Sequence, residues 1–219
     1  MAGPRDRLTP EILLHAYASG IFPMAEDAGD DTVFWVDPRF RGILPLDGFR
    51  LSRSLARTIR KAPFRASLDK AFEGVVEGCA DRDTTWINPT IFDGYRKLHA
   101  MGRAHSIELW EGEALVGGVY GVTLGRAFFG ESMFSRRRDA SKIALATLVV
   151  HLAQTGFTLF DTQFITKHLA TLGGIEVPRA RYHAMLEAAL SDGEADILSR
   201  PLPDPHSVVQ FITQTSKRE

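Results

Sequence analysis

The chain has 219 residues, of which 44% are hydrophobic and 24% are charged, and its formal net charge is −1. This composition is typical of a folded protein and argues against a disordered one. A charge near zero excludes a general attraction to nucleic acid or membrane, so any such attraction must come from a local patch. The single cysteine, Cys79, excludes an internal disulfide. The N-terminus lacks the apolar core of a signal peptide and no run has the length of a membrane span, so we expect a soluble, cytoplasmic protein.

The first 38 residues predict a small N-terminal unit. Thr9 and Pro10 precede a short helical pattern that runs to Tyr17, and a turn-rich segment then covers residues 20–31. About forty residues are too few to form an independent hydrophobic core. We therefore predict a small N-terminal domain, residues 1–38, that docks onto an acyltransferase-sized domain of residues 39–219 with a C-terminal tail.

Three helices and a β-rich region follow. The hydrophobic patterns predict helices over 51–64, around 67–80 and over 90–102. Three β-rich runs come next, at 105–112, 114–125 and 126–134. Short polar or glycine turns join these runs, which is typical of an antiparallel meander.

The second half of the chain predicts a long helix, a strand and two more helices. They cover residues 140–156, 157–163, 164–174 and 178–190, and a turn-rich tail follows. This order of elements is typical of an α+β protein with helices packed on a mainly antiparallel sheet. Acyltransferases of the GCN5-related N-acetyltransferase type share it, so we expect an acetyltransferase-like fold.

One face of the helix predicted over 51–64 carries four cations and no acid. These residues are Arg53, Arg57, Arg60 and Lys61. A charged helix face is most often simply a solvated surface. The alternative is a surface that follows a phosphate backbone, where each neutralised phosphate releases counterions.

Two polar motifs end predicted strands. Asp161 and Gln163 follow the apolar run FTLF at the spacing that places both side chains on one face of a strand. They either orient and deprotonate an amine nucleophile, or Asp161 merely caps the next helix. Glu131 follows the run VYGVTLGRAFF at a predicted strand end. It is either a binding residue or the partner of an arginine in the triplet 136–138.

The start of the predicted central helix argues against an acyl-CoA donor. Acyl-CoA enzymes of this fold hold pyrophosphate on a glycine-rich loop at that point. Here the segment is SRRRDASK, residues 135–142, which contains no glycine. We also expect no metal, because no His, Cys or carboxylate spacing matches a zinc site. His105 and His168 lie in apolar surroundings and are expected to be structural.

Several longer motifs resemble one known family. They include YASGIFPM, W-x-D-P-R, EGCADRDTTWI, LHAMGRAHSIELW, LVGGVYGV, GESMFS, DASK-x-AL, and D-x-Q followed by HL-x-x-LGG. In this order they resemble the leucyl/phenylalanyl-tRNA–protein transferases from about Tyr17 to Arg181, which is most of the chain.

The resemblance implies an aminoacyltransferase. Its members move Leu or Phe, with Met as a further candidate, from aminoacyl-tRNA to the N-terminal Arg or Lys of a protein. The added residue marks that protein for degradation by the N-degron pathway. The implied partners are Leu-tRNA, Phe-tRNA and acceptor proteins or peptides, with no cofactor, metal or membrane. An acyl-CoA-dependent acetyltransferase and a non-catalytic tRNA-binding protein are the alternatives.

The resemblance also implies roles for individual residues. Asp161 and Gln163 match the pair at the reaction centre. The positions that resemble the aminoacyl-adenosine site are Glu131, Trp86, Met24, Val119, Phe128 and Leu148. Met24 stands where other members carry a tryptophan, and its thioether can cover an adenine face. The positions that resemble the tRNA-binding patch are Arg53, Arg57, Arg60 and Lys61.

Overall fold

A computed structural model describes residues 8–26, 29 and 32–215 of the chain. The helices are α1 Pro10–Ala18, α2 Arg53–Arg60, α3 Phe72–Ala80, α4 Pro89–Ala100, α5 Ala140–Gln154, α6 Lys167–Thr171, α7 Arg179–Ser191 and α8 Pro205–Thr215. The strands are β1 Phe22–Met24, β2 Phe34–Val36, β3 Phe40–Ile43, β4 Arg65–Leu68, β5 Ala104–Glu111, β6 Ala114–Leu124, β7 Ala127–Ser135, β8 Leu159–Gln163 and β9 Ile175–Pro178.

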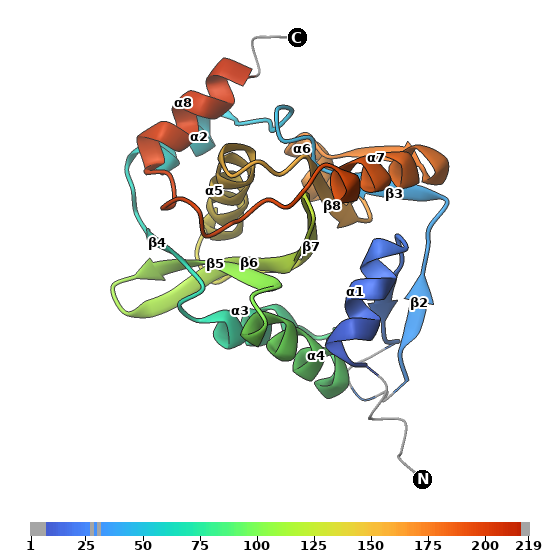
Figure 1. Cartoon of the computed structure of the whole chain (residues 1–219). Coiled ribbons are helices and arrows are strands. Elements are labelled where there is room, and N and C mark those ends of the chain that lie inside the picture. Colours follow the sequence, from blue (N-terminus) through green and yellow to red (C-terminus); the bar gives the residue numbers. More distant parts are fainter. Residues whose placement is uncertain (1–7, 27–28, 30–31, 216–219) are drawn as a thin grey trace.

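A seven-stranded sheet forms the centre of the protein, in the order β4-β5-β6-β7-β8-β3-β9. Its strands pair antiparallel except for β7 and β8, which run parallel. Helices α3 and α4 cover one face, and α5 covers the other (Figure 1). The buried helix α5 is apolar on nearly every side because α8 packs against it opposite the sheet. The mainly antiparallel α/β architecture expected from the sequence is confirmed.

Two irregularities open the middle of this sheet. Tyr120 pairs with Ser132 and Gly121 with Gly130, so Glu131 is the extra residue of a β-bulge in β7. A bulge turns its side chain away from the regular alternation of the strand. The pairing of β7 with β8 ends at Phe129 and Asp161, and the two strands separate beyond that point. The sequence placed Glu131 at a strand end; the structure places it inside a strand, at the bulge.

The N-terminal segment docks as the sequence predicted. Thr9 caps α1, whose buried side chains Leu13 and Tyr17 face the rest of the protein, and α1 packs beside α4 (Figure 1). Strands β1 and β2 form a separate two-stranded sheet. Residues 1–7, 27–28 and 30–31 of the predicted N-terminal domain lie outside the described part of the chain. The boundary after residue 38 stays a prediction, although β3 joins the large sheet directly after it.

Most predicted elements are present, and the differences arise where strand pairing outweighs local pattern. The first part of the predicted helix 67–80 is a strand instead, because β4 pairs with β5 and Asp69 then adopts a φ of 57°. The helix predicted over 164–174 shrinks to the short α6. The short strands β3 and β9 and the helix α8 were not predicted. Helix α8 forms in the tail because Val208, Val209 and Ile212 are buried in the core.

The bulge predicts a sharp sensitivity at Gly121. A Cβ atom there would overlap the carbonyl oxygen of Phe129 and the ring of Phe128. We expect Gly121→Ala to lower the free energy of unfolding by about 3 kcal/mol, because backbone must move to admit the methyl group. The control is Gly112→Ala in the β5–β6 turn, where nothing lies within 4 Å and only the φ of 59° opposes the substitution. Its cost should be about 1 kcal/mol, and equal costs in urea unfolding would contradict the overlap.

Candidate active site

Asp161 lies at the centre of a buried polar network. Arg41 of β3 donates to both of its carboxylate oxygens, from Nε at 2.9 Å and from Nη2 at 2.6 Å. The Tyr182 hydroxyl donates to Oδ2 at 2.7 Å, and the Gln163 backbone N–H donates to Oδ1 at 2.7 Å. Arg41 and Asp161 are 1% and 0% exposed. Four donors occupy the lone pairs of the two oxygens, so Asp161 acts as an ionised anchor with no free capacity to take a proton.

The Arg41 guanidinium is itself held from every side. It lies over the rings of Phe22 and Tyr182, with its Cζ 4.5 Å and 4.4 Å from the two centroids. Its Nη1 donates to the Gly20 carbonyl oxygen at 2.9 Å. The side chain therefore joins the N-terminal segment, β3, β8 and α7 at one point.

Gln163 connects this anchor to the second carboxylate. Its φ is 61°, a left-handed conformation that a residue with a side chain adopts at a cost. Its backbone N–H bonds to Asp161, while its side-chain Nε2 donates to Glu131 Oε1 at 3.0 Å. The expectation that both side chains share one strand face is wrong, because this φ turns the Gln163 amide away from Asp161 and toward Glu131.

Glu131 collects three hydrogen bonds on the other side of the opening. Tyr17 donates to Oε1 at 2.7 Å and Tyr95 donates to Oε2 at 2.6 Å, in addition to the bond from Gln163. Burial raises the pKa of Glu131 to about 7, although the three donors oppose this shift. One lone-pair direction on Oε2 is left for a further donor. A carboxylate near neutrality with spare capacity is suited to proton exchange.

The arginine triplet does not neutralise Glu131. Arg136 lies 3.6 Å from Asp81, Arg137 pairs with Glu111 at 2.8 Å, and Arg138 lies 3.7 Å from Asp139. All three arginines are exposed. The alternative in which Glu131 is merely the partner of one of them is therefore wrong.

A cavity of about 300 Å³ opens beside Glu131, where β7 and β8 separate. Its lining residues are Arg82, Trp86, Val119, Gly130, Glu131, Ser132, Met133, Leu145, Phe160, Thr162, Phe164, Thr166 and Leu169. We call it the aminoacyl cavity. Most of its wall is apolar, with the Glu131 carboxylate at one place, which is the usual composition of a small-molecule site.

The predicted aminoacyl-adenosine residues are only partly brought together. Trp86, Val119 and Glu131 line the aminoacyl cavity. Phe128 and Leu148 do not line it; both belong to the core, and the Phe128 ring meets the Phe160 ring edge-on at 5.3 Å. Phe160 in turn lines the cavity, so Phe128 lies one layer behind the wall. Met24 lies on β1, half-buried and outside that wall.

The predicted cationic face is present on α2. Ser52 caps the helix, and Leu55 and Ile59 are buried beneath it. Arg53, Arg57, Arg60 and Lys61 are exposed, and no ion pair to an acid is seen for them in the described part of the chain. Helix α2 packs beside α8, on the side of the sheet that α5 covers (Figure 1).

Four functional groups escaped the sequence analysis: Arg41, Tyr182, Tyr17 and Tyr95. Arg41 lies in a short stretch with no helical or strand pattern, and nothing in the sequence pairs it with a residue 120 positions away. Tyr95 lies on the buried side of α4 with Ile91 and Leu98, so it looked like an ordinary core residue. Tyr17 belongs to the YASGIFPM motif, which was the one available signal.

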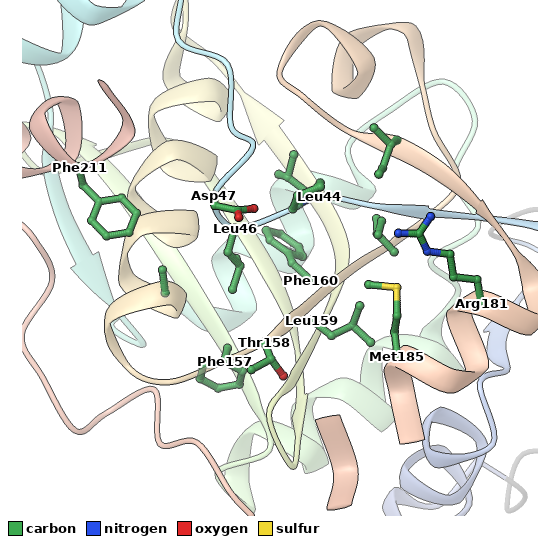
Figure 2. Close-up of a pocket in the computed structure, with 14 residues that line it drawn as sticks. Leu44, Leu46, Asp47, Phe157, Thr158, Leu159, Phe160, Arg181, Met185 and Phe211 are labelled. Carbon is green, nitrogen blue, oxygen red and sulfur yellow. The ribbon is translucent and has the colours of Figure 1, made fainter. Parts of the chain in front are cut away.

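A second cavity, of about 460 Å³, lies where β3 leaves the sheet. Figure 2 shows Leu44, Leu159, Phe160 and Met185 in its wall, with Asp47 and Arg181 reaching it from separate segments. Phe160 lines both cavities. None of the residues predicted for catalysis or binding contributes to this second cavity.

Two further searches concern metals and membranes. No group of three or more His, Cys, Asp or Glu side chains is arranged to hold a metal ion among residues 8–26, 29 and 32–215. Within the same residues, no helix combines the length and apolarity needed to cross a membrane.

Comparison with known proteins decides the family. A family model described as leucyl/phenylalanyl-tRNA protein transferase matches residues 43–187, and the model of that family's N-terminal domain matches residues 6–39. The chain belongs to the leucyl/phenylalanyl-tRNA–protein transferase family. A relative of that name from Cereibacter sphaeroides is 64% identical over 95% of this chain and 98% of its own length. Another from Ruegeria pomeroyi is 61% identical over 95% and 99%. The chain is therefore an aminoacyltransferase.

One solved structure was also compared, that of L-PGS from Bacillus licheniformis. It is 16% identical, with a TM-score of 0.39, and covers 73% of this chain and 55% of that one. A likeness this weak does not assign a fold family, so the acetyltransferase-like assignment stays a prediction.

The raised pKa of Glu131 predicts a specific pH dependence of stability. Its pKa is about 7 in the folded protein and near 4.5 in the unfolded chain, so the folded state binds the extra proton between these values. Stability should therefore fall as the pH rises through this window, by up to about 1.4 kcal/mol per pH unit.

Glu131→Gln tests this dependence. The free energy of unfolding of the parent minus that of the variant should fall by ~3 kcal/mol between about pH 4.5 and 7. Glu108, another buried acid whose pKa burial raises, contributes equally to both proteins and cancels. The control is Glu113→Gln on the exposed β5–β6 turn, whose difference curve should be flat. A flat curve for Glu131→Gln would contradict the raised pKa.

Proposed function

We propose that this enzyme moves leucine or phenylalanine from its tRNA to the α-amino group of an acceptor protein with N-terminal Arg or Lys. The observation that carries the proposal is the hydrogen-bonded connection from Asp161 through Gln163 to Glu131, at the wall of an apolar cavity. An apolar wall accepts the donor side chain, and the polar groups face the place where the ester would lie. The family assignment supports the donor and the reaction class.

The reaction itself needs little activation. The acceptor amine attacks the carbonyl carbon of the aminoacyl ester and forms the new C–N bond. The tetrahedral intermediate then collapses, the C–O bond to the tRNA breaks, and the terminal ribose hydroxyl leaves with a proton. Because an aminoacyl ester is already reactive, holding amine and carbonyl in contact supplies much of the acceleration.

We assign different roles to the two carboxylates. Asp161 has both oxygens occupied, so it fixes Gln163 in its left-handed conformation and keeps the amide directed at the cavity. The Gln163 carbonyl oxygen then orients the attacking amine. Glu131 has a pKa near neutrality and one free lone-pair direction, so it is the better acceptor for the amine proton. This assignment revises the expectation that Asp161 assists deprotonation directly.

The aminoacyl cavity selects by shape, because leucine and phenylalanine side chains offer no hydrogen bond. Val119, Leu145 and Phe160 supply the apolar wall. Such walls discriminate by about 1–3 kcal/mol per methylene, which leaves methionine as a further substrate. Phe128 and Leu148 support the wall from behind, and Trp86 is placed to stack on the terminal adenine. Met24 would complete the adenine site only from the neighbouring β1 strand.

Helix α2 is the proposed grip on the tRNA. Its four exposed cations offer the charge that a phosphate backbone requires and carry no means of reading bases. A grip on the backbone suits an enzyme that accepts several tRNAs carrying the correct amino acid. Together with the expected cytoplasmic location, this places the enzyme where charged tRNA is available, and its product would enter the N-degron pathway.

A transfer assay tests the proposed function. Labelled Phe-tRNA or Leu-tRNA is mixed with the enzyme and two peptides that differ only in beginning with Arg or with Ala. Label should appear on the Arg peptide alone. Asp161→Asn should slow the transfer at least tenfold, because a neutral amide cannot accept from all four donors around it, while tRNA binding stays within about twofold of the parent. Label on both peptides, or on neither, would refute the acceptor class or the reaction.

The charge on α2 predicts a change in salt dependence. Replacing Arg53, Arg57 and Arg60 with alanine should weaken tRNA binding at low salt and reduce the slope of log K against log[salt] by up to about three contacts, at ~0.9 each for duplex. Filter binding at four salt concentrations measures both quantities. Arg200→Ala, an exposed arginine outside α2, is the control and should leave the slope unchanged. An unchanged slope in the triple variant would exclude α2 as the grip.

A further inference from the structure

A third cavity adjoins the aminoacyl cavity. It measures about 290 Å³ and lies between the end of α3, the end of β7 and the start of α5. Arg82 and Met133 line both cavities, so the two spaces are neighbours. The other polar residues around the third cavity are Asp81, Ser135, Arg136 and Ser141. We call it the arginine cavity.

Both of its guanidinium groups are held in place. Arg82 Nη2 donates to the Met133 carbonyl oxygen at 2.5 Å and to the Ser132 hydroxyl at 3.1 Å. The Arg136 Cζ lies 5.2 Å from the centroid of the Phe134 ring. That ring can approach α3 because Gly78 has no side chain, since a Cβ there would lie 2.9 Å from the ring. Ordered guanidinium groups lose less freedom when they bind a ligand.

The chemistry of the arginine cavity suits an anion with several oxygens. Arginine forks match phosphate oxygens with paired N–H groups. The Ser135 hydroxyl accepts from the Ser141 N–H at 3.1 Å and donates to the Arg137 carbonyl oxygen, so the loop before α5 is ordered. Asp81 is the one acid in the lining, 3.6 Å from Arg136, and this pair is 77% and 51% exposed. An exposed pair this long contributes little, so a phosphate can replace Asp81 as the partner of Arg136.

We propose that the arginine cavity binds the phosphodiester group immediately before the terminal nucleotide of the donor tRNA. This inference rests on the proposed function. With the aminoacyl-adenosine in the aminoacyl cavity, the next charged group along the strand is its 5′ phosphate, and Arg82 stands between the two spaces. The site would hold the end of the strand, while α2 binds the stem at a distance. This assigns the glycine-free segment before α5 to a phosphodiester rather than to the pyrophosphate of an acyl-CoA.

Three donors of increasing length separate the sites. They are phenylalanyl-adenosine without a 5′ phosphate, a phenylalanylated CCA trinucleotide, and full Phe-tRNA. For Arg136→Ala we expect KM to rise about tenfold with the trinucleotide, as for loss of a charged hydrogen bond, and to stay unchanged with phenylalanyl-adenosine. The α2 triple variant should raise KM for the full tRNA alone.

Arg138→Ala is the matched control. Arg138 belongs to the same triplet, is 93% exposed and does not line the cavity, so its KM values should equal those of the parent. Arg136→Lys keeps the charge and should recover part of the trinucleotide affinity, while thermal unfolding confirms that each variant is folded. Equal losses for the two short donors, or for Arg136→Ala and Arg138→Ala, would overturn the phosphate site. If the parent transferred from none of the donors, the proposed function would fail, and direct binding of the uncharged trinucleotide would still test the cavity.

Discussion

The buried ion pair between Arg41 and Asp161 is the contact on which the active site depends. It joins β3 to β8 through two hydrogen bonds, while Arg41 also holds the Gly20 carbonyl oxygen and lies between two aromatic rings. A buried pair of this kind adds little net stability over an apolar pair, but removing one partner leaves an isolated charge and costs about 3–5 kcal/mol. The pair therefore fixes a geometry more than it stabilises the fold. The geometry it fixes is the left-handed turn at Gln163.

Glu131 depends on a different device. Regular alternation along β7 would direct neighbouring side chains to opposite faces of the sheet, and the bulge interrupts that alternation at this one residue. The carboxylate enters a space enclosed by Tyr17, Tyr95 and Gln163, where little water is present to solvate its charge. Desolvation and hydrogen bonding act in opposite directions on its pKa, and desolvation prevails. Two carboxylates less than a strand apart thus take different protonation behaviour from their surroundings.

The substrate-binding tasks are divided among separate surfaces. The apolar cavity is adjacent to the reaction centre, the arginine cavity is its neighbour, and α2 lies on the far side of α5 beside α8. Each surface has the chemistry of one part of an aminoacyl-tRNA: side chain and adenosine, phosphodiester, and stem. This division lets the reacting end be held by shape and hydrogen bonds, while the charged body of the tRNA supplies affinity through long-range attraction.

Hydrophobic period and turn residues were enough to predict the meander of β5 to β7, the buried α5 and the cationic face of α2, because each depends on neighbours within a few residues. The motifs also pointed to Asp161, Gln163 and Glu131 as site residues. Their local pattern did not reveal how they are arranged. The bulge, the left-handed Gln163 and the partners Arg41, Tyr182, Tyr17 and Tyr95 come from segments up to 120 residues apart. Local patterns also misplaced β4 and missed α8, since the first forms by pairing with β5 and the second by burial on the core. Whether a polar side chain becomes an anchor, a proton acceptor or a surface charge is set by burial and by distant partners, and these exist only once the chain is folded.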